Sequence, residues 1–184
     1  MIRVAVGKKI PDLQLNVAYE GTLNLTDVVG ENKTAIVFLR SCGCEVSCYE
    51  MSMYAAVYDQ IRANEGELIV VLQSSMYTLE QLKQMEKLPF VVVSDPKRQL
   101  YKEFGVMAAH SKWQLKKGRT DEYQERAKKI GLSHIEQEGS ELQLPATIII
   151  NRKLQIQYLH YGKNISDVPD GAAMLDLLRN VSSV

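Results

Sequence analysis

The sequence predicts an α/β fold in which helices cover both faces of a mixed central sheet. Three short apolar runs rich in branched residues, at 35–39, 68–72 and 90–93, are typical of fully buried central strands. Helical patterns separate these runs, and a hairpin and a last helix follow them. Alternation of strand and helix builds a parallel sheet, to which a closing hairpin adds antiparallel strands.

Three helices are predicted from spacing and capping residues. Apolar residues recur at helical spacing over 51–61, between the first two strands. Thr78 can cap a second helix that ends near residue 87. Pro96 opens a third helix through residue 104, because proline suits the first helical turn.

The last part of the chain predicts a β-hairpin and a closing helix. Strands at 147–150 and 154–159 lie on either side of a tight turn at 151–153. A helix over 170–180 then completes the fold. We find no internal repeat and no linker, so residues 1–184 are expected to form a single domain.

A polar segment at about 108–141 interrupts this alternation before the final hairpin. Within it only 123–130 has a helical pattern. A long insertion in a compact domain is either a solvated surface excursion or a lid over the working end. Trp113, the only tryptophan of the chain, is a candidate hydrophobic plug or substrate wall there. With few apolar anchors, residues 110–141 are expected to be more mobile than the sheet.

Composition excludes several classes of function. The chain has 184 residues and a formal net charge of zero, so nothing favours binding to nucleic acid or to an anionic membrane surface. No segment approaches the roughly 20 apolar residues of a membrane span, and the N-terminus has no apolar run of signal-peptide length. We therefore expect a soluble, cytoplasmic protein that needs no disulfides for stability.

All three cysteines lie within seven positions, at Cys42, Cys44 and Cys48. They stand where a buried strand passes into a helix that should begin between residues 43 and 47. A thiol in the first helical turn is favoured as thiolate by the helix dipole and by free backbone N–H groups. Cys44 and Cys48 are one turn apart, so a disulfide between them needs local unwinding, whereas Cys42 is a spare or packing thiol. Arg40 either adds positive charge near these thiols or points into solvent.

Two other interpretations of the cysteines remain. Free cysteine is often buried, so the three thiols can be inert packing residues. A zinc site is the second interpretation, but the spacing lacks paired C-x-x-C knuckles and a fourth ligand would have to be His110, His134 or His160. No Gly-rich phosphate loop or dinucleotide fingerprint is present, so no cofactor is implied.

Longer motifs resemble a known family. GKKIPDLQL, LNLTDVVGENKTAIVFLRSCGC and SDPKRQLYKEFGV resemble the peroxiredoxin and AhpC/TSA (alkyl hydroperoxide reductase/thiol-specific antioxidant) superfamily. LQLPATIIINRKLQIQYLHYGKNISDVPD is similar to its peroxiredoxin-like branch. The resemblance covers most of the chain outside the insertion, and it implies a thioredoxin-like fold with thiol-based redox chemistry.

The resemblance also proposes which cysteine reacts. Peroxiredoxins have a P-x-x-x-[TS]-x-x-C loop, and counting back from Cys44 places Ser41 at the hydroxyl position and Val37 at the proline position. Counting from Cys48 fits the pattern less well. Cys44 is therefore the candidate peroxidatic thiol, with Ser41 as a group that orients the peroxide.

The sequence also differs from the pattern of this family at the position of a positively charged residue. Typical peroxiredoxins carry an arginine just before the penultimate strand, and here the matching place is near Pro145. Residues 144–147 instead resemble the cis-proline segment of thioredoxins, so the bond before Pro145 is expected to be cis and Pro145 to lie beside the start of the Cys44 helix. Arg40 can substitute for the missing cation. His160 and Asp167 are expected to have structural roles.

Three functions follow from the resemblance. In the first, Cys44 reduces a hydroperoxide, Cys48 closes a local disulfide and a thioredoxin-type donor reduces it. In the second, Cys44 attacks a protein disulfide, Cys48 resolves the mixed disulfide and Pro145 positions the partner chain. In the third, the domain is a redox-inactive binding module. The resemblance also leaves a homodimer open.

Overall fold

The computed structural model describes residues 4–132, 136–182 and 184 of the chain. Within these residues, one mixed sheet has the strand order β2-β1-β5-β4-β3-β6-β7. The strands are β1 (Gln14–Val17), β2 (Gly21–Asn24), β3 (Lys33–Phe38), β4 (Gly66–Leu72), β5 (Val91–Ser94), β6 (Ala146–Ile150) and β7 (Ile156–Tyr161). The helices are α1 (Leu25–Val29), α2 (Glu45–Ala63), α3 (Met76–Gln81), α4 (Lys83–Glu86), α5 (Gln99–Glu103), α6 (Lys112–Leu115), α7 (Thr120–Lys129) and α8 (Gly171–Asn180).

The sheet is mixed, as the sequence predicts. β3 pairs in parallel with β4, and β4 pairs in parallel with β5. The other neighbour of β3 is β6, which runs antiparallel to it and forms a hairpin with β7. Every residue of β3 is buried, so the cysteine cluster follows directly from one of the central strands.

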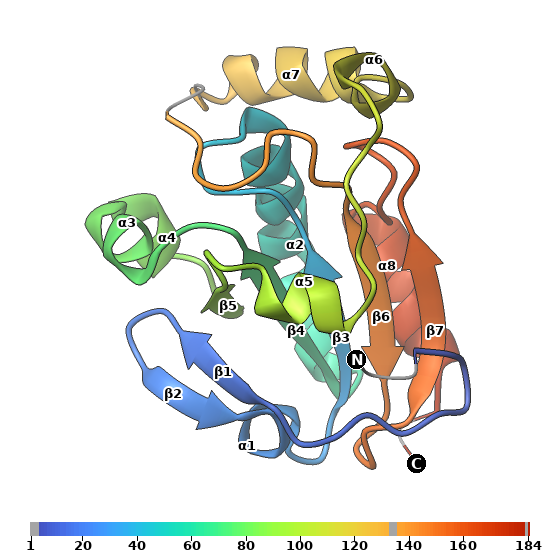
Figure 1. The fold of residues 1–184 in the computed structure, drawn as a ribbon. Helices are drawn as coiled ribbons and strands as arrows, with labels where there is room; N and C mark the ends of the chain where they lie inside the picture. Colours follow the sequence, from blue (N-terminus) through green and yellow to red (C-terminus); the bar gives the residue numbers. More distant parts are fainter. Residues whose placement is uncertain (1–3, 133–135, 183) are drawn as a thin grey trace.

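Helices cover both faces of the sheet, because successive strand residues point to opposite sides. Val37 packs in a cluster with Tyr54 of α2 and Met174 of α8. Phe38 packs on the other side with Tyr101 of α5 and with residues of α1. Figure 1 shows α2 and α8 on one side of the sheet and α5 on the other. The predicted thioredoxin-like arrangement is therefore confirmed.

Two predicted helices begin at other residues. Ser75 rather than Thr78 is the N-cap of α3, because the Ser75 hydroxyl accepts a hydrogen bond from the Thr78 backbone N–H at 3.2 Å. The helix expected from Pro96 begins only at Gln99, whose N–H donates to the Asp95 carboxylate at 2.8 Å. In both cases a side chain earlier in the sequence satisfies the free N–H groups of the first turn.

The N-terminal hairpin of β1 and β2 and the short helix α1 are not predicted by any sequence pattern. Each strand has only four residues. The turn between them contains Tyr19 with φ at 67°, a backbone conformation usually taken by glycine. The Tyr19 hydroxyl donates to the Leu79 carbonyl at 3.0 Å, so a contact distant in sequence helps to hold this turn.

Residues 108–132 and 136–141 form a layer over the N-terminal end of α2. Figure 1 shows α6 and α7 above that end, and α7 packs on α2. Tyr123 and Ala127 of α7 and Leu115 of α6 are buried. Trp113 is 74% exposed, with the Lys117 ammonium 3.6 Å from its ring centroid. Its side chain is therefore not a hydrophobic plug, and it is not among the residues that line the pocket beside Cys44.

Hydrogen exchange can test the mobility of this layer. We expect backbone amides at 110–132 and 136–141 to exchange faster than those of β3 and β4, because most of their side chains are exposed. Amides of α7 should be the slowest among them, since Tyr123 and Ala127 anchor that helix. Exchange measured by mass spectrometry would contradict this prediction if the whole layer were as slow as the sheet.

Candidate functional site

The predicted nucleophile lies at the start of the longest described helix. After β3, the backbone turns through residues 41–44, where the Cys44 N–H donates to the Ser41 carbonyl at 3.1 Å. Cys44 is the N-cap of the 19-residue helix α2, and its own carbonyl accepts from the Cys48 N–H at 2.9 Å. The predicted helix start is confirmed. A sulfur at this place feels the positive end of the helix dipole.

A pocket of about 340 Å³ opens between Cys44 and the layer formed by residues 108–132 and 136–141. The body of the fold contributes Arg40, Cys44, Glu45, Val46 and Ile165. The layer contributes Lys112, Leu115, Lys116, Thr120, Gln124, Gln137 and Glu141. Of the two interpretations of the insertion, the geometry therefore favours a lid over the working end.

Arg40 points into this pocket rather than into solvent. Its side chain lines the pocket, and the residue is only 9% exposed. Its Nη2 donates to the Gln137 side-chain carbonyl, and its Nε has no hydrogen-bond partner among the described residues. Within those residues no carboxylate pairs with this guanidinium, so its positive charge is available to a bound anion or to a developing negative charge.

Both acidic and basic side chains line the rest of the pocket. The Glu45 carboxylate accepts from the Gln124 amide at 2.5 Å, which links α2 to α7. Lys112 forms an exposed ion pair with Glu141 at 2.8 Å. Sequence reasoning missed these wall residues, and no local motif could have identified them. Most belong to a segment whose path over α2 depends on tertiary packing.

The other two thiols are reduced and are not among the residues that line this pocket. Cys42, Cys44 and Cys48 are all free and are at most 7% exposed. The Cys48 thiol donates to the Cys42 carbonyl at 3.0 Å. Burial raises the pKa of Cys48 to about 12, so this thiol is protonated at neutral pH. Burial also raises the pKa of Cys42, although a hydrogen bond from Ser74 opposes that shift.

Ser41 is close in sequence to Cys44 but does not line the pocket. Its hydroxyl is buried and has no hydrogen-bond partner among the described residues. Its carbonyl closes the turn that positions Cys44. The role of its hydroxyl in orienting a peroxide therefore stays a prediction. The backbone carbonyl of Ser41, in contrast, stabilises the turn that leads to Cys44.

The cis bond expected before Pro145 is wrong, because all peptide bonds between described residues are trans. Pro145 directly precedes β6, and its carbonyl accepts from the Gly162 N–H at 2.9 Å. A side chain on Gly162 would meet the Pro145 ring at 2.7 Å, so the two backbones lie close together. Leu144 packs in the same apolar cluster as Cys44. The segment is near the thiol, but it lacks the conformation expected for a disulfide-substrate platform.

His160 and Asp167 make the structural contact that was expected of them. The His160 Nε2 lies 2.9 Å from an Asp167 carboxylate oxygen, and the other oxygen accepts from the Lys163 N–H at 2.8 Å. The part of the chain that the structure describes contains no group of three or more histidine, cysteine or acidic side chains suited to a metal ion. His134, a candidate in the zinc interpretation, lies outside the described residues.

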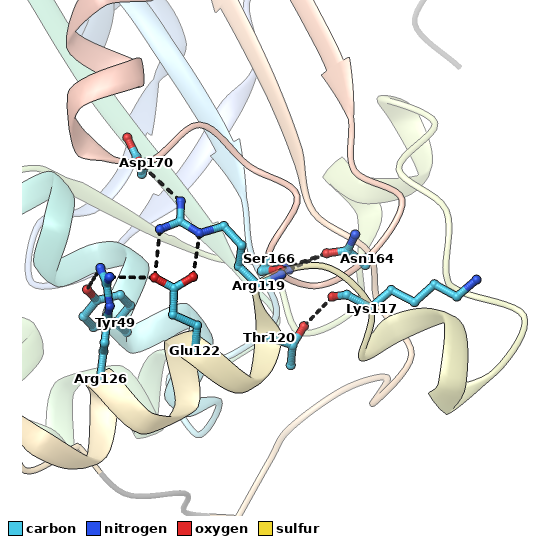
Figure 2. A network of polar contacts seen from close by, with 9 residues as sticks. All are labelled: Tyr49, Lys117, Arg119, Thr120, Glu122, Arg126, Asn164, Ser166 and Asp170. Atoms are coloured by element: carbon cyan, nitrogen blue, oxygen red, sulfur yellow. Dashed lines mark hydrogen bonds and ion pairs between the residues drawn. The ribbon is translucent and has the colours of Figure 1, made fainter.

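A polar network at the surface fastens α7 to the body of the fold (Figure 2). The Arg119 guanidinium forms two hydrogen bonds with the Glu122 carboxylate, at 3.0 and 3.2 Å, and reaches Asp170 at 3.4 Å. Glu122 also pairs with Arg126 at 2.6 Å, and Arg126 donates to the Tyr49 hydroxyl of α2. The spacing of these charges along α7 is the only sequence signal for the network.

Comparison with known proteins adds the family context. The model of the AhpC/TSA family matches residues 6–159. A comparison with curated proteins finds no match. The structure of a PrxQ mutant from Xylella fastidiosa has a TM-score of 0.69 at 14% identity, over 96% of this chain and 96% of that chain.

Two further solved structures have a similar fold. The reduced 2-Cys peroxiredoxin of Plasmodium vivax has a TM-score of 0.68 at 16% identity, over 94% of this chain and 79% of that chain. A structure described as a thiol:disulfide interchange protein, DsbE, from Chlorobium tepidum has a TM-score of 0.56 at 17% identity, over 86% of each chain. At these identities the likeness shows the fold.

Proposed function

Because this chain belongs to the AhpC/TSA family, we propose that it is a thiol peroxidase of peroxiredoxin-like type that reduces hydroperoxides. The observation that carries the proposal is the position of Cys44. It is the N-cap of α2 and opens into a pocket that it shares with a buried guanidinium. A helix N-terminus and an arginine without a carboxylate partner among the described residues are the surroundings in which a cysteine acts as a nucleophile.

In the first step, the Cys44 thiolate attacks one oxygen of the hydroperoxide. A sulfur–oxygen bond forms, the oxygen–oxygen bond breaks, and the alcohol or water leaves after taking up a proton. Cys44 becomes a sulfenic acid. In this proposal Arg40 takes the place of the cation that is absent near Pro145, because it lines the same pocket as Cys44 and its charge can stabilise the leaving oxygen. The Ser41 hydroxyl, which has no partner among the described residues, is proposed as a further donor, and this role requires the turn at 41–44 to bring it into the pocket.

In the second step, the Cys48 sulfur attacks the sulfenic sulfur of Cys44 and water leaves. The product is a local disulfide, which a donor of thioredoxin type reduces by thiol–disulfide exchange. The Cys48 N–H bond to the Cys44 carbonyl belongs to the first turn of α2. This turn must open for the two sulfurs to bond, since disulfide geometry is demanding.

Protein disulfide exchange is the second candidate, and the likeness to DsbE favours it. The trans bond before Pro145 removes its main structural argument. A redox-inactive binding module is the third candidate. This candidate is favoured only if the rate of cysteine alkylation, measured as a function of pH, reveals no thiol of low pKa.

Treatment of the protein with one equivalent of hydrogen peroxide distinguishes these three candidate functions. We expect rapid consumption of the peroxide and the loss of two free thiols with no oxygen retained, because the disulfide releases water. Mass spectrometry of the intact protein, with stopped-flow detection of the peroxide, measures both. Slow consumption together with fast reduction of a protein disulfide would support exchange instead.

A further inference from the structure

Cys48 lies close to both of the other thiols. Both Cys44 and Cys42 help to raise the pKa of Cys48, because both sulfurs are near enough to repel its thiolate. Its thiol is directed toward the backbone of Cys42, at 3.0 Å from the carbonyl oxygen. Cys42 and Cys48 also share one core cluster, whereas Cys44 packs in a separate cluster beside the pocket.

Cys42 is hydrogen-bonded to the buried hydroxyl of Ser74. The Ser74 Oγ accepts from the Cys42 N–H at 2.9 Å and donates to the Cys42 sulfur at 3.1 Å. Ser74 is fully buried, and its carbonyl accepts from the Ser94 hydroxyl at 2.8 Å, which fixes its position. A hydrogen bond to sulfur stabilises the thiolate over the thiol.

We propose that Cys42 is a third redox residue, which takes over the disulfide from Cys44. This inference rests on the proposed peroxidase function. The Cys42 thiolate attacks the Cys48 sulfur, a Cys42–Cys48 bond forms and the Cys44–Cys48 bond breaks. Cys44 leaves as the thiolate and takes up the proton that Cys42 released. The number of disulfides is unchanged, so no further oxidant or reductant is needed.

The direction of this exchange follows from the geometry of α2. A Cys44–Cys48 bond opens the first turn of the helix, where the Cys48 N–H now bonds the Cys44 carbonyl. Cys42 precedes this turn, and its carbonyl already accepts from the Cys48 thiol within one shared cluster, so we expect a Cys42–Cys48 bond to disturb the turn less. The strained disulfide is the more easily attacked of the two. The exchange moves the oxidation into the core and returns Cys44 to the pocket as a thiol.

The amount of hydrogen peroxide that each protein molecule consumes without a reductant tests this transfer of the disulfide to Cys42, which we call the relay. We expect the wild-type protein to consume about two equivalents of hydrogen peroxide, the first giving a Cys42–Cys48 disulfide and the second a sulfenic acid on Cys44. Cys42→Ser should consume about one equivalent and stop at a Cys44–Cys48 disulfide. Peptide mapping after trapping with dimedone identifies the products. Cys42→Ala is a second variant that removes the thiol without adding a hydroxyl.

The outcomes separate the relay from the peroxidase. A wild-type protein that stops after one equivalent with a Cys44–Cys48 disulfide would overturn the relay and leave the peroxidase intact. A wild-type protein that consumes no peroxide would overturn both. Equal stoichiometry in the wild type and in both Cys42 variants would also refute the relay.

Ser74 is a positioning residue in this scheme, and its variants give an independent readout. Ser74→Ala should slow the exchange about tenfold near neutral pH, the effect of losing one hydrogen bond to a charged group. The first reaction with peroxide should keep its rate. Because burial raises the pKa of Cys42, the exchange should accelerate as the pH rises, and Ser74→Ala should shift this profile to higher pH. Ser74→Thr keeps a hydroxyl and should restore the wild-type pH profile. An unshifted profile in Ser74→Ala would contradict the role of Ser74.

Discussion

Cys44→Ser is expected to abolish both peroxide consumption and disulfide formation. A serine hydroxyl remains protonated at neutral pH, and the remaining thiols cannot replace the lost thiolate. Cys48 has a pKa raised to about 12 by burial, and Cys42 is 3% exposed and does not line the pocket. Stopped-flow measurement of peroxide at neutral pH checks the result.

Cys48→Ser serves as the matched variant in the same experiment. It should react once and then stall, because the nucleophile is present and its condensation partner is not. Dimedone should trap a sulfenic acid on Cys44. Cys42→Ser should keep both the first oxidation and the formation of the Cys44–Cys48 bond. A sulfenic acid on Cys48 in the Cys44→Ser protein would show that the two roles are exchanged.

Arg40→Met is expected to lower kcat/KM for hydrogen peroxide by about 100-fold, the usual effect of removing one donor from a developing oxyanion. Methionine keeps much of the apolar volume of the side chain but removes the charge beside Cys44. The loss should appear in the rate of sulfenic acid formation and leave the later disulfide step unchanged. Arg40→Lys, which keeps a charge without the planar geometry, should recover part of the activity.

Arg152→Met is the control for this variant. Arg152 lies in the turn between β6 and β7, at the opposite end of the sheet, and forms an exposed ion pair with Glu31 at 2.9 Å. Its loss should leave the rate unchanged, since surface pairs contribute little. An Arg40→Met protein that folds normally and keeps the wild-type rate would show that Arg40 is not the missing cation.

The central sheet was predictable because its strands are buried on both faces. β3, β4 and β5 form short apolar runs, and burial on both faces requires that composition. The place of Cys44 was predictable for a related reason, since a chain leaving a buried strand for a helix must cap that helix. The hairpin of β1 and β2 was not predictable, because its strands are short and partly exposed.

The pocket walls were beyond prediction from local sequence. Lys116 and Gln124 come near Cys44 only because α7 packs on α2, and Gln124 reaches Glu45 across 79 positions of the chain. The expectation for Pro145 failed for a different reason. It rested on a resemblance of four residues, and so short a match does not determine a backbone conformation that is rare in general.

Helices α6 and α7 form the roof of the pocket, and both contribute side chains to the apolar cluster that contains Cys44. Cys44 is 2% exposed and packs in one cluster with Leu115 of α6 and Tyr123 of α7. A displacement of this roof that admits a bulky hydroperoxide therefore also brings water to the sulfur. Hydration favours the thiolate but weakens the field of Arg40, since water screens charges. If the protein is the proposed peroxidase, the same two helices would control both the size of the oxidant and the reactivity of the thiol, and we expect large hydroperoxides to meet a wetter, less strongly polarised thiol than small ones.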